Sequence, residues 1–116
     1  VIYFGSTTPA MREALDVLEA DGQHLDALRL RAFPFPDAVS EFIATHEKVF
    51  VVEQNRDAQM RSMLVNELHF DPARLVPVLH YDGTPITARF IVQAIRDNIQ
   101  PASANASAPA RQKETA

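Results

Sequence analysis

The sequence contains no cysteine, and only three of its 116 residues are glycine. Without cysteine the chain forms no disulfide, offers no thiolate to an iron-sulfur cluster and has no thiol nucleophile. Any redox chemistry must therefore be done outside these residues. A hydrophobic content of 47%, with eight prolines, is typical of a single compact domain with an ordinary core.

An excess of positive charge is also lacking, as are long hydrophobic runs. Fifteen acidic residues outnumber eleven basic ones, giving a formal charge of −4, and no lysine or arginine cluster could neutralise a row of phosphates. No apolar run approaches the ~18 residues that a membrane span requires, and the start does not resemble a signal peptide. We therefore predict a soluble, cytoplasmic protein that binds neither nucleic acid nor membrane.

The two ends of the chain differ in character. Val1 lies directly in an expected strand, Val1 to Phe4, with no initiator methionine before it, which suggests a fragment whose upstream part has been removed. Residues 101–116 are dominated by Ala, Ser and Pro and contain no apolar residue larger than Ala. Such a segment cannot bury enough surface to order itself, so we predict a domain over residues 1–100 and a flexible tail over 101–116.

Strand and helix patterns alternate four times between these ends. Continuous apolar runs or alternating residues predict strands, and apolar residues at helical spacing, bounded by Pro, Asp-Gly or Thr, predict helices. The expected strands are 1–4, 28–32, 49–52 and 76–81, and the expected helices start near residues 8, 37, 57 and 87. This alternation predicts a three-layer α/β/α fold with a parallel sheet.

The order of the strands follows from their composition. The first and third strands are apolar throughout, which favours central positions, whereas the second alternates and the fourth contains Pro77, which cannot donate to a strand ladder. The predicted order is 2-1-3-4. The connections after strands 1 and 3 then leave in opposite directions, and the loops at residues 5–8 and 53–55 should face each other at the carboxyl edge.

The first of these loops is Gly5-Ser6-Thr7-Thr8, directly before a helix. Free N–H groups at a helix start favour an anion, so a phosphate or carboxylate could bind there. The alternative is that Thr7 or Thr8 only caps the helix while Gly5 allows a tight turn. No GxGxxG or Walker-type glycine pattern supports the binding interpretation.

The second loop consists of Glu53, Gln54 and Asn55, followed by Gln59. Glu53 could serve as a general base, but the favoured interpretation is that it accepts N–H groups of the facing helix or pairs with Arg56. Asn55 and Gln59 are expected to fix the loop and the first turn of the next helix. The candidate crevice or interface therefore comprises Gly5, Ser6, Thr7, Thr8, Glu53, Gln54, Asn55 and Gln59.

Other site types find little support. The four histidines have no metal-ligand spacing, and no histidine or lysine base lies near Ser6 in the sequence, as a hydrolase would need. A signalling receiver domain requires an acidic pair after strand 1 and a phosphoacceptor Asp after strand 3, where this chain has Gly5-Ser6 and Glu53. We predict no catalytic and no metal-binding residues in this chain.

Several short motifs, taken together, resemble the carboxyl-terminal part of the α subunit of 2-oxoacid:ferredoxin oxidoreductases, most closely the 2-oxoglutarate type. The resemblance covers nearly all of residues 1–100. It is carried by YFGST at 3–7, LRLR at 28–31 with PFP at 34–36, VVEQN at 51–55 with Gln59, and YDGTPIT at 81–87.

The resemblance implies a transketolase carboxyl-terminal fold inside a thiamine-diphosphate enzyme. The holoenzyme oxidatively decarboxylates a 2-oxoacid, forms an acyl-CoA and passes electrons through iron-sulfur clusters to ferredoxin. In that family thiamine diphosphate and Mg²⁺ are held by a GDG-containing motif of another subunit and by an upstream domain, and CoA is a co-substrate. This chain would then be an inactive assembly domain whose partners are the β subunit and the remainder of α.

The chain departs from the family pattern in three places. Ala58 stands where a Gly is frequent, which predicts a less sharp turn into the third helix. Arg89 and Phe90 follow Thr87 where acidic residues are common, which costs the last helix about 0.5 to 1 kcal/mol. The family's upstream antiparallel strand is absent from the start, leaving strand 2 with an open edge. The alternative function is an independent small-molecule or anion-binding module that uses the Ser6-Thr7 helix terminus.

Overall fold

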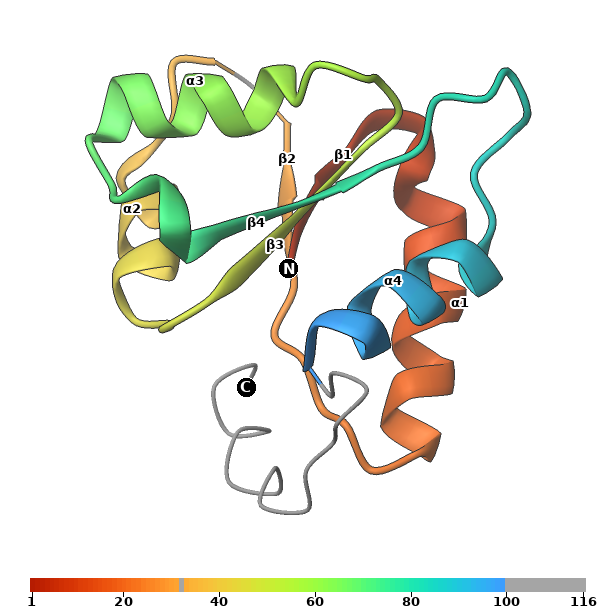
Figure 1. Cartoon of the computed structure of the whole chain (residues 1–116). Coiled ribbons are helices and arrows are strands. Elements are labelled where there is room, and N and C mark those ends of the chain that lie inside the picture. Colours follow the sequence, from red (N-terminus) through yellow and green to blue (C-terminus); the bar gives the residue numbers. More distant parts are fainter. Residues whose placement is uncertain (32, 100–116) are drawn as a thin grey trace.

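The structure, a computed structural model, describes residues 1–31 and 33–99. Its centre is a parallel sheet of four strands, β1 (Ile2–Phe4), β2 (Leu28–Leu30), β3 (Val49–Glu53) and β4 (Leu75–Leu79), in the order β2-β1-β3-β4 (Figure 1). The predicted fold class and strand order are confirmed. The predicted tail, residues 101–116, lies outside the described residues.

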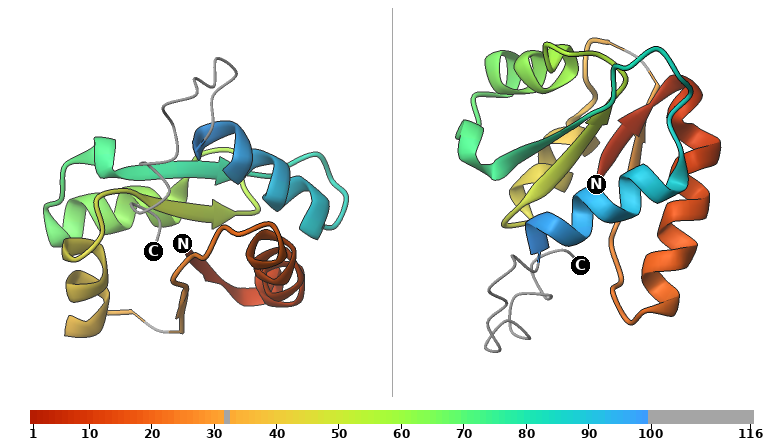
Figure 2. Two further views of the ribbon diagram at one scale, coloured as in Figure 1. Left: turned by 90° about the horizontal axis from the view of Figure 1, so that it is seen from below. Right: turned by 45° about the vertical axis from the view of Figure 1, so that its right-hand side comes forward.

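Four helices cover the two faces of the sheet. Helices α1 (Thr8–Ala20) and α4 (Ala88–Ile99) pack side by side on one face, and α2 (Asp37–Ala44) and α3 (Gln59–Leu68) lie on the other (Figures 1 and 2). The three-layer α/β/α arrangement is therefore as predicted.

The core has one half on each side of the sheet because side chains alternate along each strand. On β3, Phe50 and Val52 pack against α1 and α4, whereas Val49 and Val51 pack against α2 and α3. All five residues of β3 are buried, which explains why its apolar run is continuous.

Some element boundaries differ from the sequence-based expectation. Strand β4 is an edge strand, as Pro77 predicted, but it spans 75–79 rather than 76–81, and β2 ends at Leu30. Helix α3 starts at Gln59 rather than near 57, and it ends at Leu68 because His69 adopts a left-handed conformation with φ of 61°. Helix α2 starts at Asp37, as expected, and ends at Ala44.

The start of α4 is capped by Thr87. The hydroxyl of Thr87 accepts a hydrogen bond from the amide of Phe90 at 3.1 Å, as an N-cap residue does. Buried Ile91, Ile95 and Ile99 then hold the helix against the sheet despite Arg89 in its first turn.

Candidate functional site at the carboxyl edge of the sheet

The loop after β1 is a tight turn built on Gly5. Its φ of 62° lies in the left-handed region, where glycine is favoured, and residues 5–7 form one turn of 3-10 helix that leads into α1. The hydroxyl of Thr8 donates a 2.9 Å hydrogen bond to the carbonyl of Gly5 and closes this turn. The expected role of Gly5 in a tight turn is confirmed.

The expected capping role of Thr7 or Thr8 is wrong. Thr7 occupies the N-cap position of α1, but its side chain accepts no N–H group of the helix, and the Thr8 hydroxyl donates backwards to Gly5. The physical reason is that Thr7 has a helical backbone (φ −71°, ψ −17°), whereas a capping side chain normally requires an extended one.

Gln54 connects the two polar loops. Its side-chain amide donates to the hydroxyl of Ser6 and to that of Thr7, both at 3.1 Å, across more than forty residues of sequence. The loops that the strand order placed opposite each other are thus in direct contact. Gln54 and Ser6 are exposed at the surface, whereas Thr7 is buried.

Glu53 is fully buried at the end of β3 and serves as an acceptor for helix α3. Its Oε1 accepts from the amide of Met60 at 2.7 Å and from the side chain of Asn55 at 2.8 Å, and its Oε2 accepts from the amide of Arg61 at 2.9 Å. These amides belong to the first turn of α3, where N–H groups lack partners within the helix and the dipole favours a negative charge. The prediction that Glu53 accepts N–H groups of the facing helix is therefore confirmed.

Arg56 does not pair with Glu53, contrary to the other part of that interpretation. Its guanidinium lies 3.3 Å from the carboxylate of Asp57, and both side chains are largely exposed. The carboxylate of Glu53 is buried and already accepts from three donors, two of them amides of the first turn of α3.

The turn between Asn55 and Gln59 is sharper than predicted. Asn55 accepts from the amide of Gln59 at 3.3 Å, which fixes the first turn of α3 as expected. Ala58 adopts a left-handed conformation with φ of 51°, which is unfavourable for any residue with a Cβ. The chain therefore makes the glycine-type turn with an alanine.

The contacts of this site limit its chemistry. The only hydrogen-bond partner described for the Ser6 hydroxyl is the amide of Gln54, which cannot accept a proton as a catalytic base does. Glu53 is out of reach of a substrate because its carboxylate is buried and engaged by three donors. Among residues 1–31 and 33–99, no three or more His, Asp or Glu side chains gather as metal ligands would.

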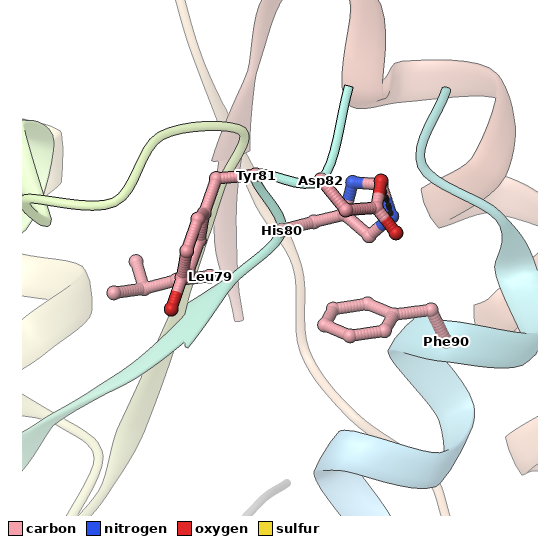
Figure 3. A pocket seen from close by; sticks show the side chains of 5 residues that line it. All are labelled: Leu79, His80, Tyr81, Asp82 and Phe90. Atoms are coloured by element: carbon pink, nitrogen blue, oxygen red, sulfur yellow. Dashed lines mark ion pairs between the residues drawn. The ribbon is translucent and has the colours of Figure 1, made fainter. Parts of the chain in front are cut away.

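A second feature of the carboxyl edge escaped the sequence analysis. An open pocket after β4 is lined by Leu79, His80, Tyr81, Asp82 and Phe90, with the His80 ring edge-on to Phe90 at 4.8 Å (Figure 3). Hydrogen bonds from the Thr84 hydroxyl and amide hold the pKa of the Asp82 carboxyl below its usual value. The adjacent His-Tyr-Asp in the sequence was the only signal that could have pointed to it.

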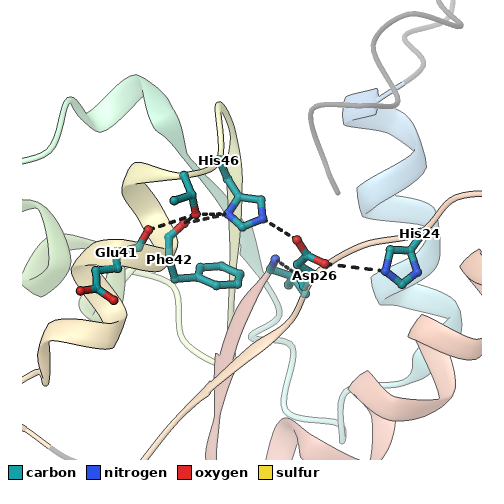
Figure 4. Close-up of polar contacts among 7 residues, drawn as sticks. His24, Asp26, Glu41, Phe42 and His46 are labelled. Carbon is teal, nitrogen blue, oxygen red and sulfur yellow. Dashed lines mark hydrogen bonds and ion pairs between the residues drawn. The ribbon is translucent and has the colours of Figure 1, made fainter.

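The opposite edge of the sheet has a polar cluster of its own. Asp26 brings together His24 and His46, with 2.7 Å from its carboxylate to Nε2 of His46 and 3.7 Å to Nε2 of His24 (Figure 4). The other ring nitrogen of His46 lies 2.7 Å from the carbonyl of Phe42. This cluster ties the segment before β2 to the end of α2. It lies at the amino edge, whereas ligands of open α/β sheets bind at the carboxyl edge.

Comparison with known proteins gives one informative match. No family model and no curated protein matches this chain. The structure is similar to part of a solved 2-oxoglutarate:ferredoxin oxidoreductase from Magnetococcus marinus, which has 2-oxoglutarate, coenzyme A and succinyl-CoA bound. The TM-score is 0.76, the sequence identity is 31%, and the match covers 85% of this chain. This chain resembles a domain of that oxidoreductase.

The match agrees with the family resemblance and the fold that the sequence predicted. It confirms the resemblance that the short motifs predicted, and its fold agrees with the observed α/β sheet of order 2-1-3-4. The chain spans 17% of the length of the matched oxidoreductase chain. Within the described part of the chain, no helix is long and apolar enough to span a bilayer.

Proposed function

We propose that this chain is a non-catalytic assembly domain of the α subunit of a thiamine-diphosphate-dependent 2-oxoacid:ferredoxin oxidoreductase, of the 2-oxoglutarate type. The holoenzyme would oxidatively decarboxylate the 2-oxoacid to an acyl-CoA and reduce ferredoxin in the cytoplasm. The observation that carries the proposal is the match over 85% of the chain at 31% identity to a 2-oxoglutarate:ferredoxin oxidoreductase. The short sequence motifs resemble the same family.

The residues of the candidate site do not fit the cofactors of such an enzyme. An iron-sulfur cluster needs cysteine ligands, and the whole sequence contains none. Mg²⁺ with a diphosphate needs accessible carboxylate or carbonyl oxygens, whereas the carboxylate after β3 is buried and engaged by three donors. Thiamine diphosphate, Mg²⁺ and the clusters would therefore be held by the remainder of the α subunit and by the β subunit.

The geometry of the carboxyl edge is suited to a supporting role. Glu53 fixes the start of α3, and Gln54 ties the loop after β3 to the loop after β1. These contacts tie the two loops of the carboxyl edge to each other and to the start of α3. A rigid edge of this kind can orient a neighbouring domain because little conformational entropy is lost when it docks.

Co-purification tests the proposal. The chain would be co-expressed without a tag beside tagged β subunit and tagged α subunit lacking this domain. We expect it to elute with them and to restore CoA-dependent reduction of ferredoxin by 2-oxoglutarate, while the chain alone is inactive. A folded chain that associates with neither polypeptide at micromolar concentration would contradict the proposal.

A matched variant separates assembly from catalysis. Ser6→Ala removes the exposed hydroxyl that a nucleophilic mechanism would need but leaves the bond between Gln54 and Thr7. We expect the assembled enzyme to keep its kcat within about twofold of the wild type. A fall of a hundredfold or more at unchanged assembly would show that the loop takes part in the chemistry.

The alternative of an independent anion-binding module stays a prediction, and no structural observation favours it. The hydroxyls of Ser6 and Thr7 already accept from Gln54, and Pro9 removes one N–H from the first turn of α1. Calorimetry with CoA would show binding at millimolar concentration or tighter, weakened in Thr7→Val, if this module existed.

A further inference from the structure

A groove of about 320 Å³ lies at the carboxyl edge beside the site described above. Its walls come from the ends of β1 and β2, from the segment that follows β2 and from the first turn of α3, and its lining is Phe4, Gly5, Leu30, Arg31, Phe33, Phe35 and Met60. We call it the Phe33 groove. Its volume is at the low end of the range for small-molecule sites, so it suits one or two inserted side chains better than a whole cofactor.

Phe33 is the most unusual residue of the groove. Its side chain is 56% exposed, although it stacks edge-on against Phe35 at a ring distance of 5.2 Å. Among the described residues, the other large hydrophobic side chains that stand out from the surface are Tyr81, also at the carboxyl edge, and Val17 on α1. A single exposed apolar residue needs no explanation, but an aromatic pair at the mouth of an apolar groove is typical of an interface anchor.

Arg31 gives the groove a charge. It is exposed at the rim and forms no ion pair with any residue that the structure describes. An acidic side chain on a docking partner could pair with its guanidinium in a bidentate geometry. The groove therefore favours an apolar segment that has an acidic residue beside it over a basic one.

We propose that the Phe33 groove is the surface on which the remainder of the α subunit docks, through an apolar segment with an adjacent Asp or Glu. This inference rests on the proposed function. The length of the matched oxidoreductase supports this occupant, because this chain corresponds to 17% of that polypeptide, and the remaining length supplies segments that can cover the groove. The position supports it too, since the groove adjoins Gly5 and the start of α3, the part of the edge that Glu53 and Gln54 hold rigid.

The test compares the association of three variants with the tagged remainder of the α subunit, in the presence of the β subunit, measured by biolayer interferometry. Phe33→Ser should weaken association at least tenfold, and Arg31→Glu should weaken it by an amount that shrinks at high salt. Val17→Ser is the matched control, because Val17 is an exposed apolar residue 41% accessible on α1, away from the groove. It should change association less than about twofold.

Separate outcomes distinguish the two proposals. If the wild-type chain associates and Phe33→Ser binds equally well, the groove is not the docking surface and the assembly function stands. If the wild-type chain does not associate, both fail. If instead sedimentation shows that the wild-type chain forms a dimer that Phe33→Ser abolishes, a second copy occupies the groove and the inference is overturned. Circular dichroism melts of all three variants within about 3 °C of wild type establish that each is folded.

Discussion

Replacing Glu53 should destabilise the whole domain, because one buried carboxylate organises the start of α3. It accepts hydrogen bonds from Met60, Arg61 and Asn55 at 2.7, 2.9 and 2.8 Å and is fully buried. Hydrogen bonds to a charged group contribute about 1.5 to 3 kcal/mol each, and the helix dipole adds about 0.3 to 2 kcal/mol. These values do not add, and burying the carboxylate offsets part of them.

The size of the loss depends on the replacement. Glu53→Gln keeps the shape and one acceptor oxygen but turns an NH₂ group toward an N–H donor. We expect it to lower the free energy of unfolding by about 2 to 4 kcal/mol. Glu53→Ala leaves three buried donors without a partner and should cost about 3 to 5 kcal/mol. Such a loss is a large fraction of the about 5 to 15 kcal/mol that stabilises a typical domain.

Urea unfolding followed by far-ultraviolet circular dichroism measures this loss, and Asp57→Asn provides the control. Asp57 is an exposed carboxylate four residues away that contacts only Arg56 among the contacts described, so its change should stay within about 0.5 kcal/mol. Native-state hydrogen exchange adds a local readout, since the amides of Met60 and Arg61 should lose protection in Glu53→Gln. If Glu53→Gln unfolds within 0.5 kcal/mol of wild type, the carboxylate does not organise α3 and our account of the site is wrong.

Two further changes test other parts of the structure. Ala58→Gly should stabilise the fold by about 0.5 to 1 kcal/mol in urea, because glycine tolerates the left-handed φ of 51°, and a loss would refute the strained turn. Arg74→Ala should cost about 2 to 3 kcal/mol, since its guanidinium donates to the carbonyls of Ile43 and His46 at the end of α2, whereas Arg56→Ala should have no measurable effect.

The order of elements and the sheet topology could be predicted from the sequence alone. The continuous apolar run at 49–52 and the proline in the last strand fix which strands are central and which lie at an edge, because burial on two faces and ladder hydrogen bonding are properties of the residues themselves. The same reasoning placed Glu53 at the end of a buried strand next to a helix start. Its role as a helix acceptor followed from chemistry that does not depend on the rest of the fold.

Tertiary structure decided which side chains meet. Thr7 bonds to Gln54 instead of capping its own helix, because a loop more than forty residues away in sequence presents a donor to its hydroxyl. Asp26 contacts both His24 and His46, and Phe33 lies at a groove that three separate segments of the chain form. The spacing of residues in the sequence indicates neither the cluster nor the groove. Ala58 takes a left-handed conformation that its own preference opposes, because Glu53 and Asn55 hold the first turn of α3 in place. The local preferences of the residues determine where helices and strands form. Contacts between segments that are distant in sequence determine which side chains meet at the site.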